Sequence, residues 1–486
     1  MSKEGGNVRI HMIAVCGTGM GSLAGMLKAQ GHEVDGCDSA LYPPMSGALA
    51  AYGVKALKGF DPRHLDPPPD LVIIGNAVHK DNPEAKAAMG GSIEYLSMAE
   101  AVHRFAVEGR ESLVVAGTHG KTTTTAICGF LLEESDLAPN VLVGGIVNGW
   151  ESSFRWNGGE WTVLEGDEYE TSFFDKEPKF LHYDPSLLLL NNLEMDHRDN
   201  FASLAELEAA FERLLGKVRT GGKVIAGTES PSIVKVIKAA GVEAESFGTT
   251  GEEDWSVSSI DYLDGLTRLA VTHGGKATGV FESPLCGPHN ARNVVGAIAA
   301  CVTAGAPIEK LREALKRFPG VRRRQQKVWS GGGLTVIDDF AHHPTAIGLT
   351  IRGLRQCYPG PKLVVCFEPR SYTCQTNIHQ EALVPALSLA DEVYVGPFNP
   401  YDKIPPGERL DTSRLVEDIR KRGVDAHFIG DQGKYLELFG MRPTEPTVVV
   451  FFSSGPFFNM PAKLVNMASE WATAVTGALP EGTSAK

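Results

Sequence analysis

Short apolar runs recur along the chain, and most are followed by a polar or glycine-rich turn and a segment of helical length. The first run, residues 8–15, precedes a glycine-rich turn and a segment predicted to be helical as far as about Gln30. Further runs at 33–37 and 71–74 repeat the pattern. Strands that alternate with helices build a parallel sheet covered on both faces. The N-terminal region is therefore predicted to be a doubly wound α/β domain.

The same alternation restarts after Arg110, and again after the chain break at Phe318-Pro-Gly320. In the second region we expect strands at 161–164, 187–190 and 223–226, and a helix at 291–304. Polar and apolar residues alternate over 254–272, which favours an antiparallel insert with one exposed face. In the third region we expect strands at 335–337, 362–367, 392–395 and 447–452.

Composition narrows the class of protein. The formal net charge of −13 argues against a general nucleic-acid or anionic-membrane surface, because both would repel the chain. The eight cysteines include no Cys-x-x-Cys pair, and most lie in apolar runs, which is typical of reduced cysteines in a core. The N-terminus lacks the apolar segment of a signal peptide, and no apolar run approaches the ~20 residues needed to span a bilayer. We expect a cytoplasmic enzyme.

A phosphate-binding loop is predicted where the apolar run 112–116 ends in Gly117-Thr-His-Gly-Lys-Thr-Thr123. Glycines at this position let backbone amides and a helix N-terminus face a polyphosphate, while Lys121 reaches the β- and γ-phosphates and Thr122 binds Mg²⁺. Only two residues separate the glycines, where the usual loop has four. An ordinary glycine turn is the alternative, but it leaves Lys121 and Thr122 unexplained. The residues expected to bind ATP here are Gly117, Thr118, His119, Gly120, Lys121, Thr122 and Thr123.

A chain of 486 residues is too long for a single hydrophobic core. We predict an α/β protein of three domains. They are a Rossmann-like N-terminal domain (1–109), a central P-loop ATPase-type α/β domain (110–320) and a C-terminal Rossmann-like α/β domain (321–486).

A second glycine-rich turn, Cys16-Gly-Thr-Gly-Met-Gly-Ser22, follows the first predicted strand, and Asp38 ends the next. It is similar to a dinucleotide fingerprint, although Ser22 stands where the third glycine should be. Its free amides favour a diphosphate. A tight turn with no ligand is the alternative. The candidate binding residues are Gly17, Thr18, Gly19, Met20 and Gly21, with Asp38 beside them.

Polar clusters follow two predicted strands of the central region. Glu165 begins the acidic segment Glu165-Gly-Asp-Glu-Tyr-Glu170, and Asn192, Asp196 and His197 follow the strand 187–190. Carboxyl ends of parallel strands meet at the ligand edge of such a sheet. Glu165 is therefore a candidate Mg²⁺ ligand, and His197 could bind a second ion or orient a phosphate. Taken singly, an acidic surface loop and a capping Asp-His pair are the alternatives.

Three further clusters lie nearer the C-terminus. In Gly287-Pro-His-Asn290, His289 or Asn290 could cap a helix or reach an adenine edge, and both interpretations stay open. Asp338-Asp-Phe-Ala-His-His-Pro344 ends another predicted strand. Arg324 suits a γ-phosphate or a substrate carboxylate. Glu368-Pro-Arg-Ser371 either supplies Arg370 and Ser371 to a site or is a plain loop.

Taken in order, these motifs resemble the Mur ligases, the ATP-dependent amide-forming enzymes of peptidoglycan assembly. The match runs through all three predicted domains. The resemblance implies that ATP and Mg²⁺ are the cofactors and that the first domain binds UDP-N-acetylmuramate. It implies catalytic roles for Lys121, Glu165, His197 and Arg324, with Mg²⁺ on Thr122, Glu165 and His197. Further implied contacts to ATP are His289, Asn290 at the adenine, Asn293, and Asp339 at the ribose. Further implied contacts to the substrates are Asn76, Asn192, His197, His342, Arg370 and Ser371.

Within the family, the segments 169–176 and 179–183 resemble the branch that attaches the murein tripeptide L-alanyl-γ-D-glutamyl-meso-diaminopimelate to UDP-N-acetylmuramate. The branch that attaches L-alanine is the alternative, and the first domain cannot separate the two. Two other classes stay in view: a nicotinamide oxidoreductase, based on Gly17–Gly21 alone, and a nucleotide-switched binding protein without catalysis. We expect small-molecule partners, with no nucleic acid or membrane. Monomer and dimer are both left open.

Overall fold

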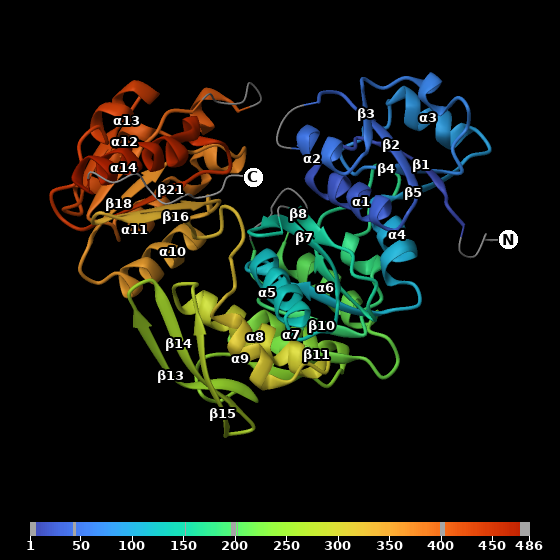
Figure 1. Ribbon diagram of the computed structural model, residues 1–486, viewed down its shortest axis with the longest axis horizontal. Helices are drawn as coiled ribbons and strands as arrows, with labels where there is room; N and C mark the ends of the chain where they lie inside the picture. The colour runs from blue at the N-terminus through green and yellow to red at the C-terminus, as the bar shows by residue number, and fades with distance from the viewer. Residues whose placement is uncertain are drawn as a thin grey trace. The chain divides into compact units, whose positions relative to one another are not determined.

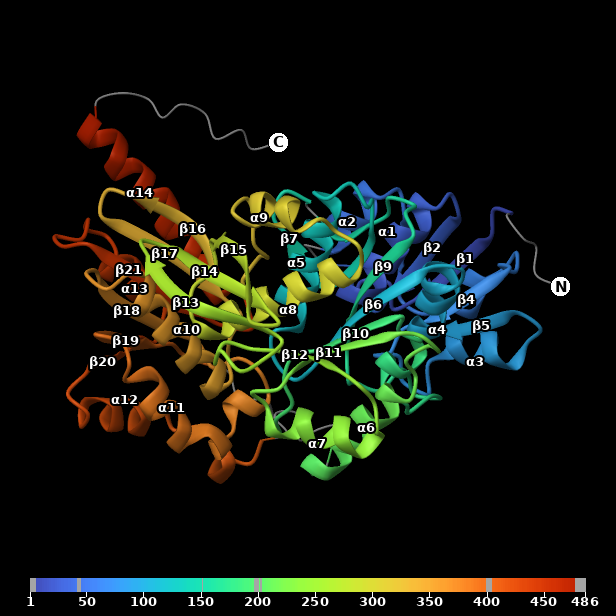
Figure 2. The same ribbon diagram turned by 90° about the horizontal axis from the view of Figure 1, so that it is seen from below.

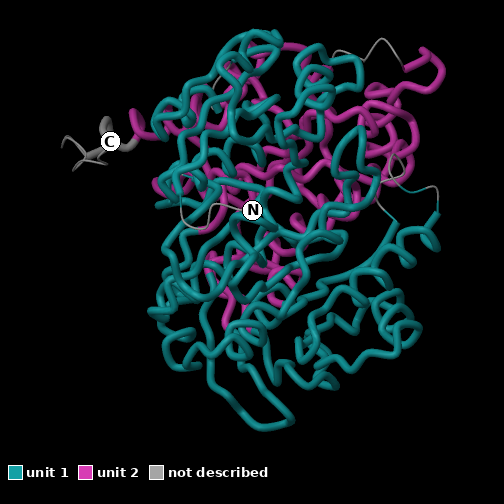
Figure 3. Tube along the Cα trace, turned by 90° about the vertical axis from the view of Figure 1, so that its right-hand side faces the viewer, with its two compact units in different colours: residues 1–260, 269–283, 292–319 teal, residues 261–268, 284–291, 320–486 magenta. Residues whose placement is uncertain are grey.

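The computed structural model describes residues 6–41, 45–150, 152–195, 201, 203–398 and 404–476. The chain divides into two compact units, shown in teal and magenta in Figure 3. The first comprises residues 1–260, 269–283 and 292–319, and the second comprises 261–268, 284–291 and 320–486. Each unit is built on sheets covered by helices, and the predicted α/β class is confirmed.

The N-terminal sheet has five parallel strands in the order β3-β2-β1-β4-β5 (Figure 1). Side chains alternate along β1 and β4. Met12 and Ile73 pack with Leu23 of α1, whereas Ile13 and Ile74 pack with the α3 side. Helices therefore cover both faces. The elements are β1 (Arg9–Ile13), α1 (Thr18–Ala29), β2 (Glu33–Asp38), α2 (Met45–Ala51), β3 (Lys55–Lys58), β4 (Leu71–Ile74), α3 (Pro83–Gly90), β5 (Glu94–Ser97) and α4 (Met98–Val102).

The central sheet has ten strands in the order β15-β14-β13-β12-β11-β10-β6-β9-β7-β8. Helices α6 and α7 lie on one face of its parallel part, and α5, α8 and α9 lie on the other (Figure 2). Two-residue connections join β13, β14 and β15 into hairpins, so the insert is antiparallel as predicted. The strands are β6 (Glu111–Ala116), β7 (Asn140–Val147), β8 (Ser152–Arg155), β9 (Trp161–Gly166), β10 (Leu187–Leu190), β11 (Lys223–Gly227), β12 (Glu245–Phe247), β13 (Trp255–Leu263), β14 (Leu266–His273) and β15 (Lys276–Ser283). The helices are α5 (Lys121–Glu133), α6 (Leu204–Leu215), α7 (Pro231–Ala240), α8 (Pro288–Thr303) and α9 (Ile308–Leu315).

The third sheet has six strands in the order β16-β17-β21-β18-β19-β20, and only β16 is antiparallel to its neighbour. Val365 and Val450 face α10, α11 and α12, whereas Val364 and Val449 face α13 and α14. The strands are β16 (Gln326–Gly331), β17 (Leu334–Asp339), β18 (Lys362–Phe367), β19 (Glu392–Val395), β20 (Asp425–Phe428) and β21 (Thr447–Phe452). The helices are α10 (Pro344–Cys357), α11 (Gln380–Leu387), α12 (Thr412–Arg420), α13 (Gln432–Leu438) and α14 (Met460–Thr476).

Two element boundaries differ from the sequence prediction in ways that affect the site. Strand β9 continues to Gly166, because Glu165 and Gly166 still pair with Val115 and Ala116 of β6. Glu165 therefore lies within the strand and not after it. Helix α8 begins at Pro288, so His289 and Asn290 lie in its first turn. Among the described residues, no helix combines the length and the apolar character that crossing a membrane requires.

Candidate functional site

The loop between β6 and α5 folds as the sequence predicts. Gly117 and Gly120 have φ values of 137° and 81°, a region that suits glycine. A Cβ at Gly117 would lie 2.8 Å from the Asn192 carbonyl oxygen, and one at Gly120 would lie 2.5 Å from Asn293 Oδ1. Both glycines are thus required by conformation and by close approach. Asn293 of α8, predicted to bind ATP, lies against the phosphate loop.

Asn192 anchors this loop through three hydrogen bonds. The backbone N–H of His119 donates to Asn192 Oδ1 at 2.8 Å, and Asn192 Nδ2 donates to the His119 carbonyl at 2.9 Å. The N–H of Thr118 donates to the Asn192 carbonyl at 2.9 Å. Asn192 was expected among the substrate-binding residues. In the structure its amide holds the phosphate loop in shape.

Lys121 lies at the start of α5 and is buried. Its Nζ donates to Glu168 Oε2 at 2.7 Å and to the Gly117 carbonyl at 2.7 Å. Burial opposes the charge on Lys121, but the carboxylates of Glu168 and Asp167 outweigh it and raise the pKa of Lys121. The ammonium group is therefore kept protonated at the loop that is predicted to bind phosphate.

Thr122 and Glu165, predicted to share Mg²⁺, are in direct contact. Thr122 Oγ1 donates to Glu165 Oε1 at 2.9 Å, and the Gly144 N–H donates to Glu165 Oε2 at 2.6 Å. Burial raises the pKa of Glu165. A hydroxyl and a carboxylate side by side are hard oxygen donors that suit Mg²⁺, with Asp167 close by. The other predicted ligand, His197, lies with Asp196 outside the described residues.

A cavity of about 660 Å³ extends from the glycine-rich turn before α1 to this carboxylate. Its volume falls within the range of about 300–1,000 Å³ found for small-molecule sites. Predicted residues that line it are Gly17, Thr18, Gly19, Met20, Asp38, Asn76 and Glu165. Gly21 does not line it: a Cβ there would lie 2.2 Å from Met45 Sδ, so this glycine serves packing against α2.

The first turn of α1 presents backbone amides toward this cavity. Gly17 is the N-cap and has no side-chain capping bond, and Asp38 Oδ2 accepts the Cys16 N–H at 2.9 Å. The turn is therefore held in place from the neighbouring strand, while the amides at the start of the helix favour an anion.

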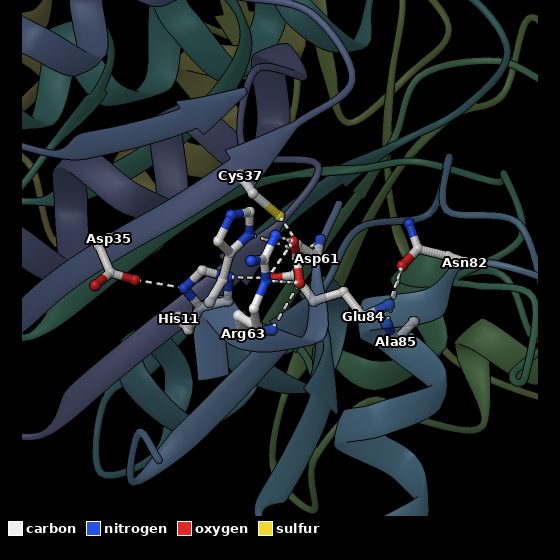
Figure 4. Close-up of polar contacts among 9 residues, drawn as sticks. His11, Asp35, Cys37, Asp61, Arg63, Asn82, Glu84 and Ala85 are labelled. Carbon is white, nitrogen blue, oxygen red and sulfur yellow. Dashed lines mark hydrogen bonds and ion pairs between the residues drawn. The ribbon is translucent and has the colours of Figure 1, made fainter. Parts of the chain in front are cut away.

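A buried network behind the cavity centres on Glu84 of α3 (Figure 4). Its Oε1 lies 2.6 Å from His11 Nε2, and its Oε2 accepts from the Cys37 thiol at 3.1 Å and the Asp61 N–H at 3.0 Å. Two ligands of one tetrahedral zinc ion would lie roughly 3.3 Å apart, so the 2.6 Å contact is a direct hydrogen bond. The network is close in sequence to the cavity wall. Asp38 directly follows Cys37, Asn82 precedes Glu84 by two residues, and both Asp38 and Asn82 line the cavity.

His11 gives this network a pH dependence. Burial opposes its charge, but hydrogen bonds to Asp35 and Glu84 prevail and raise its pKa from 6.5 to about 9. Because the folded state binds this proton more tightly, the stabilisation is complete below pH 6.5 and is lost as the pH rises through about 9. We expect this to remove about 3 kcal/mol from the free energy of unfolding. Urea denaturation at pH 6.5, 8 and 9.5 checks it. The His11→Gln variant should be less stable, and its free energy of unfolding should no longer fall between pH 6.5 and 9.5. An unchanged pH dependence in this variant would contradict the assignment.

The remaining predicted residues belong to the second unit. Asp339 is buried, and its two oxygens accept the N–H groups of Gln325 and Ala341, both at 2.7 Å. The Arg324 guanidinium lies 5.2 Å from the centre of the Phe340 ring. Other contacts pair His342 Nδ1 with the Phe340 carbonyl oxygen at 3.2 Å, Arg370 with Glu368 at 3.6 Å, Ser371 Oγ with the Cys374 N–H at 3.3 Å, His289 Nε2 with Gln325 at 3.3 Å and Asn290 Nδ2 with the Cys286 carbonyl at 2.9 Å.

Sequence reasoning missed several residues of the first unit's site. Glu168 pairs with Lys121, Asn191 donates to Thr124 at 2.9 Å, and Lys179 lines the cavity. Glu168 and Asn191 stand within motifs that had been singled out, so the signal was present. Their partners lie 47 and 67 residues away in the chain, and only the fold reveals them.

The predicted phosphate loop follows β6, an inner strand of the central sheet, and one further α/β sheet precedes this sheet in sequence while another follows it. These features define a P-loop α/β protein. Sequence comparison gives the family. The model described as "Mur ligase family, catalytic domain" matches residues 9–110, "Mur ligase middle domain" matches 115–301, and "Mur ligase, glutamate ligase domain" matches 323–455. The chain belongs to the Mur ligase family.

Individual relatives extend the comparison. The UDP-N-acetylmuramate–L-alanyl-gamma-D-glutamyl-meso-2,6-diaminoheptandioate ligase of Escherichia coli is 38% identical over 389 residues, covering 80% of this chain and 84% of that protein. A murein peptide ligase from Psychrobacter arcticus has 28% identity and a TM-score of 0.66, covering 95% of this chain and 98% of its own. A UDP-N-acetylmuramate-alanine ligase from Thermotoga maritima has 25% identity and a TM-score of 0.76, covering 96% and 100%.

Proposed function

We propose that the chain joins the lactyl carboxylate of UDP-N-acetylmuramate to the α-amine of L-alanyl-γ-D-glutamyl-meso-diaminopimelate, at the expense of ATP, in cytoplasmic peptidoglycan recycling. The observation that carries this proposal is the cavity. It connects the helix N-terminus at Gly17, whose free amides favour an anion, with Glu165, which Thr122 of the predicted phosphate loop contacts at 2.9 Å. A sugar diphosphate bound at one end would extend its acid toward the other.

The chemistry requires activation, because a carboxylate is a poor acylating agent. Transfer of the γ-phosphoryl group of ATP to the lactyl carboxylate gives an acyl phosphate. The peptide amine attacks it, and the tetrahedral intermediate collapses to amide and phosphate. Lys121 stabilises charge on the transferred group, and closure of the site keeps water from the acyl phosphate.

Mg²⁺ held by Thr122, Glu165 and His197 would offset the repulsion between the two reacting anions. Arg324, in the C-terminal domain (321–486), would likewise offset the negative charge of the two reacting anions. We assign Asn290, with His289 and Asn293, to adenine and Asp339 to ribose. His342, Arg370 and Ser371 are assigned to the incoming peptide, whose carboxylates need a cation. Asn192 acts by holding the phosphate loop.

The tripeptide is favoured over L-alanine because the 38% identical relative carries the tripeptide in its name, whereas a relative named as an L-alanine ligase is 34% identical. The segment 169–183, which resembles the tripeptide branch, also reaches the site, since Lys179 and Tyr183 line the cavity.

Phosphate release tests this proposal. With ATP, Mg²⁺ and UDP-N-acetylmuramate present, the tripeptide is expected to raise the rate well above that with L-alanine, because only the preferred amine captures the acyl phosphate. Reactions without UDP-N-acetylmuramate are the control. Faster release with L-alanine than with tripeptide would establish the alternative branch, and release that no amine stimulates would refute a ligase.

A further inference from the structure

The charge of the cavity wall does not match the ligand that we assign to it. The carboxylates of Asp38, Asp81, Glu165 and Asp167 line the cavity. Among the described lining residues Lys179 is the only lysine or arginine, and the imidazole of His79 is paired with Asp81 at 3.3 Å. A sugar nucleotide with a diphosphate and a carboxylate is strongly anionic. The backbone amides at the start of α1 can bind one of these anionic groups, and Lys179 is the cation available to bind the other.

Lys179 is held in a fixed position on this wall. It begins the short 3₁₀ helix Lys179–His182, which the buried side chains of Phe180 and Leu181 anchor in the core. The side chain of Lys179 is only 13% exposed, and its Nζ donates to Asp167 Oδ2 at 2.8 Å. Its rotamer entropy is therefore largely lost before any ligand binds, which favours affinity.

Asp167 also ties Lys179 to the reacting end of the cavity. It follows Glu165 by two residues, and both carboxylates line the cavity. An ammonium group has three N–H donors, so Lys179 can keep Asp167 and bind a second carboxylate. A separate segment, the turn between β1 and α1, supplies another part of the cavity wall, where Gly17 and Thr18 lie at the N-terminus of α1.

We propose that Lys179 binds the lactyl carboxylate of UDP-N-acetylmuramate and so selects this sugar nucleotide over UDP-N-acetylglucosamine, which has a hydroxyl there. This inference rests on the proposed function and adds the residue that recognises the acid. Asp167 acts as a positioning residue, because it holds the Lys179 ammonium group at 2.8 Å.

Binding of both sugar nucleotides, measured by titration calorimetry in EDTA without ATP, tests the assignment. Lys179→Met should weaken the binding of UDP-N-acetylmuramate by roughly 10- to 100-fold, which corresponds to the usual strength of one charge-assisted hydrogen bond. The affinity for UDP-N-acetylglucosamine should stay within about twofold of that of the unaltered protein. Lys179→Arg should restore part of the loss. Lys176→Met is the matched control, because Lys176 lies three residues earlier with a side chain 64% exposed, paired with Glu170.

Comparison with UDP-N-acetylglucosamine distinguishes recognition of the lactyl carboxylate from a purely structural role of Lys179. Equal losses for both sugar nucleotides would show that Lys179 only supports the wall, and no loss for either would show that it contacts neither. Equal affinity of the unaltered protein for both would also overturn the assignment. Failure of the unaltered protein to bind UDP-N-acetylmuramate would refute the proposed function itself, a result distinct from the other three.

Discussion

Lys121→Ala is expected to lower amine-dependent phosphate release by at least about 100- to 1,000-fold, the usual effect of removing one preorganised charge from a transition state. The structure adds a second consequence. Glu168 is 3% exposed and pairs with Lys121 at 2.7 Å, so truncation of the lysine leaves a buried carboxylate without its cation. Stability should therefore fall together with activity.

A double variant separates the two effects. Adding Glu168→Gln to Lys121→Ala removes the orphaned charge and should recover much of the lost stability, because a neutral amide costs less to bury. It should recover none of the activity. Thermal unfolding and initial rates, measured on the same preparations, check this. Substantial turnover in a folded Lys121→Ala protein would remove the phosphate loop from the mechanism.

Glu84→Gln is expected to reduce the free energy of unfolding by roughly 3–5 kcal/mol, the usual cost of breaking a buried ion pair. Glu84 is fully buried, and its Oε2 accepts from the Cys37 thiol, the Asp61 N–H and His64, while Oε1 faces His11. An amide of the same shape places N–H groups where these donors point. His11 would also keep only Asp35 as its carboxylate.

Urea denaturation at pH 7, followed by tryptophan fluorescence, measures this loss. Glu94→Gln is the matched control, because Glu94 is an exposed carboxylate of the same N-terminal sheet, paired with Arg104 at 2.6 Å. Glu94→Gln should lower the free energy of unfolding by less than about 1 kcal/mol. Similar losses in the two variants would show that the network behind the cavity adds little beyond an ordinary surface pair.

The strands of the core could be predicted because their signal is local. The runs 71–74 and 187–190 match β4 and β10 residue for residue, since a fully buried parallel strand needs a continuous apolar run. Edge strands gave no such signal. Lys55–Lys58 and Asp425–Phe428 are partly exposed and each begins with a charged residue, and pairing with a neighbour makes them strands.

For the site, the sequence by itself determined which segments form the candidate site. Glycine spacing and the residues that end apolar strands located the phosphate loop, Glu165 and the turn at Gly17, because backbone conformation and strand direction depend on near neighbours. Only the tertiary structure decided the partners: Glu168 for Lys121, Gly144 for Glu165, and Asp167 for a lysine that faces the cavity. These contacts join separate turns and strand ends, and no local pattern encodes which of them the packed sheet brings together.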